Sequence, residues 1–173
     1  AEIALGSVGA VIETLEKEGF LQHRNHTRKL VNLEELFDVW ANNFDSTIRP
    51  HLFQRGMSFA DKTVRSNWKN IQLRNAYWGG EPAANLLDNY LVPEKFVLYS
   101  SLSMQELMKE YKLIPNDLNG EILWMLPPFE KRTNLEIDPF IIYAELILSK
   151  DSRCHEAAQR IKQKYIDPAL RNI

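Results

Sequence analysis

The chain has 173 residues, of which 45% are hydrophobic and 25% charged, and its formal net charge is −2 at pH 7. This balance is typical of a globular protein and excludes a disordered chain. No apolar run approaches the roughly 20 residues that span a bilayer, and no segment has the pattern of a secretory signal peptide. We therefore expect a cytoplasmic protein without membrane contact. The single cysteine, Cys154, excludes an internal disulfide.

The chain opens with a predicted amphipathic helix that is followed by a hairpin. Apolar residues at the spacing i, i+3, i+4, i+7 mark one face of this helix: Val8, Val11, Ile12 and Leu15. Ser7 is the predicted N-cap, and Gly19 the predicted left-handed residue at the helix end. The polar, basic stretch 22–29 lies between two short apolar runs, which predicts a hairpin with a cationic tip. Because the chain begins with Ala and starts inside this helix, we expect the intact protein to extend further upstream.

Helices and short strands alternate through the rest of the chain, which predicts an α+β fold. Asn32 and Glu35 resemble a capping box that opens a helix to about residue 43, and Ser103 and Glu106 resemble a second one. Further elements are expected in this order: a strand ending near 78 with a Gly turn and a helix, a strand over 96–99, strands over 113–114 and 122–125 around the turn 116–120, and closing helices over 138–149 and 154–165.

A helix, a glycine stop and an apolar–basic–apolar hairpin are typical of the second half of a winged helix-turn-helix. Residues of the outward helix face that could approach bases are Ser7, Gly9, Ala10 and Thr14, and hairpin residues that could contact phosphate are Arg24, His26, Arg28 and Lys29. Glu13, Glu16 and Glu18 favour the alternative of a docking element with a solvated tip, because carboxylates repel phosphate. We predict a partial winged helix-turn-helix at 1–45, and at 46–173 a mixed α/β domain with a small sheet and two closing helices.

The net charge hides a basic segment that follows an acidic helix. Residues 46–75 contain one carboxylate, Asp61, and six cations: Arg49, Arg55, Lys62, Arg65, Lys69 and Arg74. Lys62, Arg65 and Lys69 follow at the spacing i, i+3, i+7, which predicts one face of a helix. This face could follow a phosphate backbone, bind RNA or bind an acidic partner. The alternative is a solvated face, or pairing with the acidic helix over 32–45. Trp68 lies among these cations, where a place in the core is favoured over base stacking.

Four stretches of the chain carry a resemblance to known proteins. Residues 5–20 resemble the recognition helix of bacterial winged-helix regulators. Residues 30–40, 79–91 and 142–153 resemble, in order and spacing, the AbiEi family of transcriptional regulators, the antitoxins of type IV toxin–antitoxin systems. The last of these stretches is the most specific, because a helix, a short turn and Arg153 follow in fixed register.

The resemblance implies a regulator that binds operator DNA, represses its own operon and acts as antitoxin in phage defence. It implies a nucleotidyltransferase-like toxin as functional partner, and it leaves the oligomeric state open. The alternative is that residues 46–173 form an interaction module that neutralises the toxin, or binds RNA through its basic face, without DNA.

Enzyme motifs are incomplete in this sequence. Gly79-Gly80 followed by Asp88 resembles the metal-binding motif of nucleotidyltransferases, but a second acid is missing. Cys154 and its neighbour His155 point about 100° apart on a helix and form no nucleophile–base pair. The histidines are scattered at positions 23, 26, 51 and 155, so a zinc site is not expected. We predict no enzyme, no cofactor and no metal site.

Overall fold

The computed structural model describes residues 5–24, 27–128 and 138–172. The chain begins with a helix and a two-stranded hairpin: α1 (Leu5–Lys17), β1 (Leu21–Arg24) and β2 (Thr27–Leu30). The main sheet and the helices between its strands follow: α2 (Leu33–Thr47), α3 (Arg49–Leu52), β3 (Phe53–Phe59), α4 (Lys62–Ser66), the 3-10 turn η1 (Trp68–Asn70), β4 (Ala76–Gly79), α5 (Gly80–Asp88), β5 (Phe96–Ser100), α6 (Met104–Tyr111), β6 (Leu113–Pro115) and β7 (Ile122–Met125). Helical segments close the chain: α7 (Pro139–Ile147), α8 (Ser152–Ile161), the π-helical η2 (Lys162–Ile166) and α9 (Asp167–Arg171). The predicted α+β fold class is confirmed.

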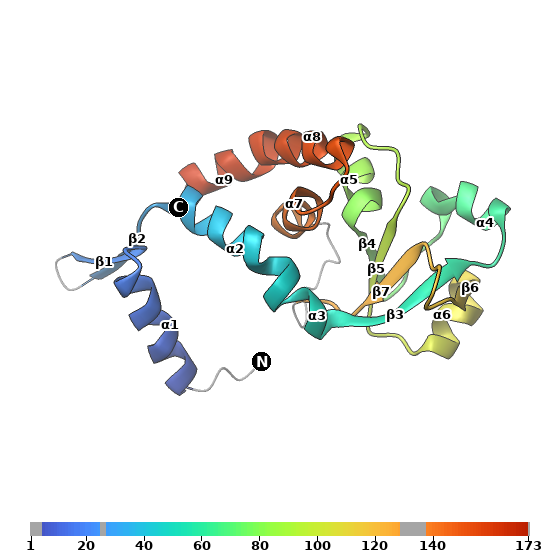
Figure 1. The fold of residues 1–173 in the computed structure, drawn as a ribbon, viewed down its shortest axis with the longest axis horizontal. Coiled ribbons are helices and arrows are strands. Elements are labelled where there is room, and N and C mark those ends of the chain that lie inside the picture. Colours follow the sequence, from blue (N-terminus) through green and yellow to red (C-terminus); the bar gives the residue numbers. More distant parts are fainter. Residues whose placement is uncertain (1–4, 25–26, 129–137, 173) are drawn as a thin grey trace.

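A five-stranded mixed sheet separates two apolar cores. Its strand order is β4-β5-β7-β3-β6, in which β5 and β7 run parallel and the other neighbours antiparallel. Because successive side chains of a strand point to opposite faces, Val97 and Tyr99 of β5 join one core, whereas Phe96 and Leu98 join the other. Helices α2, α5, α7 and α8 contribute to the first core, and α6 and η1 to the second (Figure 1).

Helix α2 packs into the first core. Phe37, Ala41 and Phe44 are buried there with residues of α7 and α8, and the Phe37 ring contacts the rings of Phe140 and Tyr143. The sequence groups this helix with the winged-helix segment that ends at residue 45, although its buried face packs on residues well beyond that boundary. We therefore propose that the division between the two domains falls near residue 32.

The connection from β6 to β7 crosses the face of β3. The two strands pair with β3 on opposite sides, so they are not the adjacent strand–turn–strand pair that their sequence predicts. Gly56 and Gly120 allow this crossing, because a Cβ atom on them would lie 2.6 Å and 2.4 Å from the backbone oxygen of Asn116. Strand β3 itself falls within the segment whose sequence indicates only a basic surface, and its central position is decided by this long-range pairing.

Two predicted N-caps are wrong, although the second helix does begin directly after Asn32. Ser7 is not an N-cap, because α1 already includes Leu5. Asn32 makes no side-chain cap to α2 and instead adopts the left-handed conformation with φ 54°, which Asn tolerates better than most residues. By contrast, the capping box of Ser103 and Glu106 at α6 is confirmed.

The predicted basic helix is also interrupted. Helix α4 ends at Ser66, and η1 begins a new turn at Trp68. The Trp68 ring packs against Trp78 and Phe96 in the second core, which confirms its predicted place in the core. The three cations expected on one helical face therefore lie on two separate short turns: Lys62 and Arg65 on α4, and Lys69 on η1.

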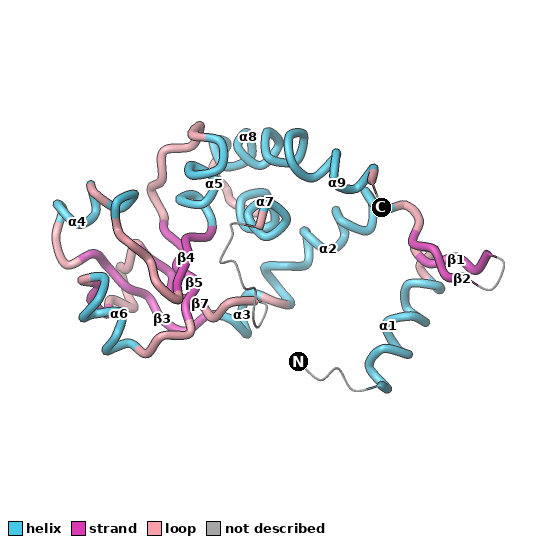
Figure 2. The backbone as a smooth tube through the Cα atoms, turned by 180° about the vertical axis from the view of Figure 1, so that it is seen from behind, coloured by secondary structure: helices cyan, strands magenta, loops and turns pink. Residues whose placement is uncertain are grey.

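Helix α1 and the hairpin form a lobe at one end of the molecule, apart from the main sheet (Figures 1 and 2). The strands pair from Leu21 with Leu30 to Arg24 with Thr27, which confirms the hairpin. Gly19 has φ +80°, which confirms its left-handed role at the end of the helix, and the adjacent Phe20 is buried. Across the residues that the structure describes, no helix combines the length and the apolar character that a bilayer crossing needs.

Candidate functional site

The face of α1 predicted to approach bases is open to solvent. Gly9, Ala10 and Thr14 are exposed, and no atom lies within 4 Å of a Cβ built on Gly9. The Thr14 hydroxyl donates to the Ala10 carbonyl at 2.8 Å, so it bonds within its own helix in this state. The side chain of Ser7 lies outside the described residues.

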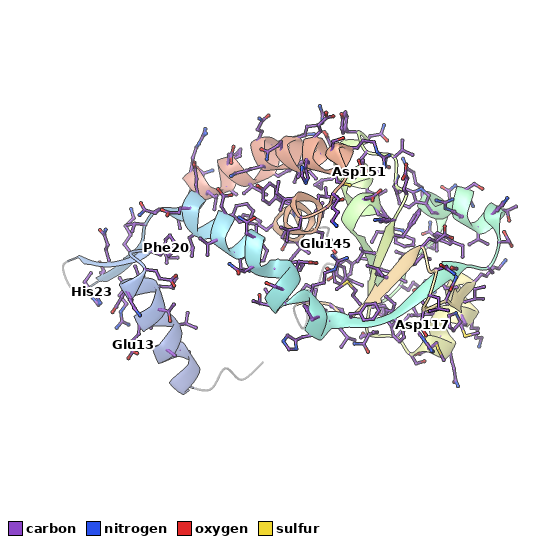
Figure 3. The ribbon with its side chains drawn as sticks, in the orientation of Figure 1. Glu13, Phe20, His23, Asp117, Glu145 and Asp151 are labelled. Carbon is purple, nitrogen blue, oxygen red and sulfur yellow. The ribbon has the colours of Figure 1, made fainter. Side chains whose placement is uncertain are left out.

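The hairpin presents two described cations. Arg28 and Lys29 are exposed on β2, and Arg28 lies opposite His23 on β1. Glu16, near the end of α1, accepts a contact from each strand: its Oε1 lies 2.7 Å from His23 Nε2 and 3.7 Å from Arg28 Nε. One carboxylate therefore ties the hairpin to the helix and partly neutralises Arg28 (His23 is labelled in Figure 3). The side chain of Arg24 and the whole of His26, which were also predicted to contact phosphate, lie outside the described residues.

The opposite, apolar face of α1 is open as well. Val8 and Val11 are 41% and 57% exposed. The predicted apolar stripe is therefore present in the helix, and some of it has no covering surface among the described residues.

Three of the six cations of the predicted basic surface are paired with nearby carboxylates. Arg49 contacts Asp45 at 2.7 Å, Arg55 contacts Asp117 at 2.8 Å, and Arg65 contacts Glu121 at 2.9 Å. Lys69 donates to the side-chain oxygen of Asn89 at 3.3 Å. Their partners belong to different parts of the chain, and the binding role of these cations stays a prediction.

Two of the stretches that carry the family resemblance meet at the start of α5. The Gly80 backbone N–H donates to Glu145 Oε2 at 2.6 Å, and the Tyr99 hydroxyl donates to Glu145 Oε1 at 2.9 Å. Gly79 has no room for a side chain, because a Cβ would lie 2.5 Å from the Tyr99 ring. Burial raises the pKa of the Glu145 carboxyl, and the two hydrogen bonds act in the opposite direction.

The bond between Gly80 and Glu145 argues against reading Gly79-Gly80 and Asp88 as the metal-binding motif of a nucleotidyltransferase. A helix N-terminus attracts anions because its first N–H groups lack partners. Here the carboxylate of Glu145 already takes that place at α5. Asp88, the only acid of the compared motif, lies at the end of α5 and is paired with Arg160 at 2.5 Å. The described residues contain no grouping of three or more His, Cys, Asp or Glu that could hold a metal ion.

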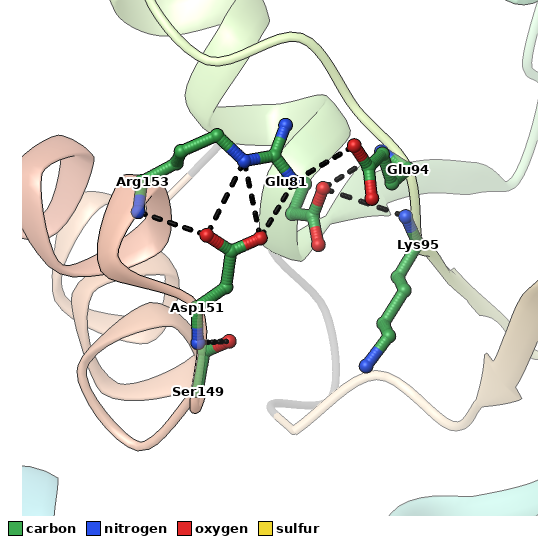
Figure 4. A network of polar contacts seen from close by, with 6 residues as sticks. All are labelled: Glu81, Glu94, Lys95, Ser149, Asp151 and Arg153. Atoms are coloured by element: carbon green, nitrogen blue, oxygen red, sulfur yellow. Dashed lines mark hydrogen bonds and ion pairs between the residues drawn. The ribbon is translucent and has the colours of Figure 1, made fainter.

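A second polar network fixes the loop between α5 and β5 to the start of α8 (Figure 4). The buried Glu81 accepts the backbone N–H groups of Glu94 at 2.7 Å and Lys95 at 3.4 Å. Asp151 caps α8, accepts from the Arg153 guanidinium at 2.6 Å, and has its pKa lowered chiefly by that hydrogen bond. Arg153 also reaches Glu94 at 3.0 Å.

The sequence pattern does not single out Glu145 or Glu81 as important residues. The sequence offers one signal for Glu145, which is that it is a lone carboxylate within the apolar helical stretch Pro139–Ile147. Such a residue needs a partner when it is buried. Which partner it has, in this case a backbone group 65 residues away, is not visible in the sequence.

These surfaces define an α+β protein with a projecting helix–hairpin lobe and a sheet-based body whose buried carboxylates are bonded internally. Residues 29–167 match the model of a family described as transcriptional regulator, AbiEi antitoxin, type IV toxin–antitoxin system. The chain therefore belongs to the AbiEi family of transcriptional regulators and antitoxins, as its resemblance predicted. No curated protein and no solved structure matches the chain.

Proposed function

We propose that this protein is the DNA-binding repressor and antitoxin of a type IV toxin–antitoxin operon, and that it binds operator DNA with α1 and the β1–β2 hairpin. The functional partner is a nucleotidyltransferase-like toxin, and the system acts in phage defence within the cytoplasm. This proposal rests on membership of the family, whose description supplies the transcriptional and antitoxin roles.

One observation supports the location of the DNA surface. The small residues Gly9 and Ala10 and the cations Arg28 and Lys29 are all exposed on the same projecting lobe. Small residues allow a helix to approach base edges closely, and cations beside it neutralise phosphate. Ser7 and Thr14 add hydroxyls to the same helix, while Arg24 and His26 add charge to the hairpin sequence.

The test is binding to the double-stranded DNA upstream of the protein's own gene, measured by fluorescence anisotropy over a salt titration. Each lost phosphate contact reduces the slope of log K against log salt by about 0.9. Replacing Arg28→Ala together with Lys29→Ala should weaken binding and flatten this slope by up to about 2.

The matched control is Lys109→Ala with Lys150→Ala, which removes the same charge from exposed positions elsewhere. The control should bind like the unaltered chain. An equal loss in both double variants, or no loss in either, would contradict the assignment of the hairpin.

The second candidate function is neutralisation of the toxin without DNA. It is favoured by the extent of the family match, which begins at residue 29 and leaves α1 outside. Co-expression of the neighbouring toxin gene with the whole chain separates the two candidates. If the Arg28→Ala, Lys29→Ala variant still rescues growth, antitoxin action is independent of the hairpin; if rescue is lost, it depends on that surface.

A further inference from the structure

A polar cleft lies at the end of the molecule opposite α1 and the hairpin. It has a volume of about 580 Å³ and is bounded on one side by α4 and the segment that follows η1, and on the other by the end of α6. Both sides belong to the end of the molecule farthest from α1 (Figure 1). Clefts of roughly 300–1,000 Å³ are of the size that holds small organic ligands.

Amide side chains dominate one wall of this cleft. Asn67, Asn70 and Gln72 line it and are exposed, and the Asn70 amide nitrogen donates to the Asn67 oxygen. This bond leaves further donors and acceptors on all three amides for a ligand. Val64 and Ile71 are partly buried and supply apolar surface between them.

The opposite wall carries charges of both signs. Glu110 and Lys112 line the cleft on either side of the buried Tyr111. The carboxylate of Glu110 requires hydrogen-bond donors on a ligand, whereas the ammonium group of Lys112 favours an anion. Lys112 has a left-handed backbone, with φ 53°, so the chain reverses here from α6 into β6.

A hydrogen-bonded link holds the two walls in place. The Tyr111 hydroxyl accepts the backbone N–H of Arg74 at 2.9 Å and donates to the Arg74 carbonyl. The walls of the cleft are therefore held relative to each other before any ligand binds. In the sequence, Lys62 precedes the lining residue Thr63 and Arg74 follows the lining residue Gln72 by two positions, and both cations are exposed.

We propose that this cleft binds an unpaired nucleotide of a single-stranded nucleic acid. Amides read base edges because they present a donor and an acceptor together, and Glu110 accepts from the N–H donors that bases carry. Phosphate has no such donors, so it lies toward Lys112, a cation of the cleft lining. An unpaired base also offers its Watson–Crick edge, which base pairing in a duplex occupies, and proteins that read RNA sequence bind unpaired bases on this edge.

The proposal is independent of the operator surface, since the cleft lies at the opposite end of the molecule from α1 and the hairpin. The probes are 12-nucleotide single strands labelled with fluorescein, one of RNA and one of DNA with the same mixed sequence, and the corresponding DNA duplex. Anisotropy is measured with the whole 173-residue chain. We expect one or both single strands to bind at the cleft, and the difference between them identifies whether the 2′-hydroxyl contributes.

The decisive variant is Asn70→Ala with Gln72→Ala, which should weaken single-strand binding at least about tenfold. The matched control is Asn42→Ala with Asn43→Ala, which removes two exposed amides from α2 and should leave single-strand binding unchanged. Thermal unfolding confirms that both variants fold.

Several results would overturn the proposal. They are the absence of single-strand binding, equal losses in the two amide variants, and binding that depends on salt but not on the cleft amides. The hairpin variant Arg28→Ala, Lys29→Ala separates this proposal from the operator proposal. It should lose duplex binding and keep single-strand binding, whereas loss of both would show that the strand binds at the hairpin instead.

Discussion

The backbone N–H of Gly80 donates to the Glu145 carboxylate at 2.6 Å across 65 residues of sequence. This bond joins the first residue of α5 to the middle of α7, and Tyr99 on the central sheet donates to the same carboxylate. A carboxylate at a helix N-terminus is stabilised by the unpaired N–H groups and by the helix dipole. The two bonds therefore tie α7 to the start of α5 and to β5 (Glu145 is labelled in Figure 3).

We predict that Glu145→Gln makes stability less sensitive to pH. Burial raises the pKa of this carboxyl above its ordinary value of 4.5, so the folded state binds more protons than the unfolded state just above that pH. The contribution of Glu145 to the free energy of unfolding therefore falls as the pH rises from about 4.5 through the folded-state pKa. The thermal midpoint of the variant minus that of the unaltered protein should increase over this interval and then level off.

Glu145→Ala serves as the comparison for that prediction. It removes both acceptors and leaves the Gly80 N–H and the Tyr99 hydroxyl without partners, which costs about 1–3 kcal/mol for each buried group. Urea unfolding should show lower stability at every pH. If Gln and Ala variants behaved alike, the hydrogen bonds of Glu145 would not be stabilising.

Because the connection from β6 to β7 crosses β3 closely at Gly56 and Gly120, we predict that one added methyl group at either position lowers the stability of the protein. Gly56→Ala and Gly120→Ala each place a methyl group against backbone atoms at less than 3 Å, and such overpacking costs about 1–3 kcal/mol. Gly9→Ala adds the same methyl group where nothing lies within 4 Å, so it should not destabilise the protein. Denaturant midpoints of the three variants measure this difference, and a Gly56→Ala protein as stable as Gly9→Ala would contradict the close crossing.

Glu81 is expected to control the loop between α5 and β5. Replacing Glu81→Ala removes the acceptor of the Glu94 and Lys95 amides, so their hydrogen exchange should become faster. Glu94→Ala is the control, because it removes only an ion pair of a side chain that is 66% exposed, and exposed pairs contribute about 0–1 kcal/mol. Unchanged exchange in the Glu81→Ala protein would show that the loop is held by other contacts.

Glu16 is expected to weaken binding of the hairpin to DNA. Its carboxylate lies 3.7 Å from Arg28 and competes with phosphate for the guanidinium. Glu16→Gln should therefore raise duplex affinity and steepen the salt slope, up to about one additional released counterion. Glu13→Gln is the control, because it removes the same charge from an exposed position of α1. If both variants raised affinity equally, the effect would come from net charge rather than from the pair with Arg28.

Local features were predicted from the sequence where neighbouring residues decide them. Gly19 ends α1 with φ +80°, and Ser103 with Glu106 caps α6, because both depend on contacts within one turn. The hairpin over 22–29 and the two closing helices follow from short apolar periods in the same way. The family match over residues 29–167 agrees with the resemblance that the sequence carries.

Long-range pairing was decided by the tertiary structure alone. Strand β3 lies between β6 and β7 because its backbone completes the sheet, although its own sequence indicates only a basic surface. The predicted basic helix is broken at residue 66 because Trp68 turns into the second core. Helix α2 belongs to the first core rather than to the hairpin lobe because its apolar face packs on α7.

The sequence by itself therefore determined the fold class, the family, the helix–hairpin unit and the helix ends at Gly19 and Ser103, since these depend on residue type and short spacing. The tertiary structure decided the partners of Glu81 and Glu145, the order of the strands and the long-range pairs of Arg55 and Arg65. Those depend on which distant segments meet, and a residue such as Glu145 acquires its role only when Gly80 and Tyr99 are brought to it.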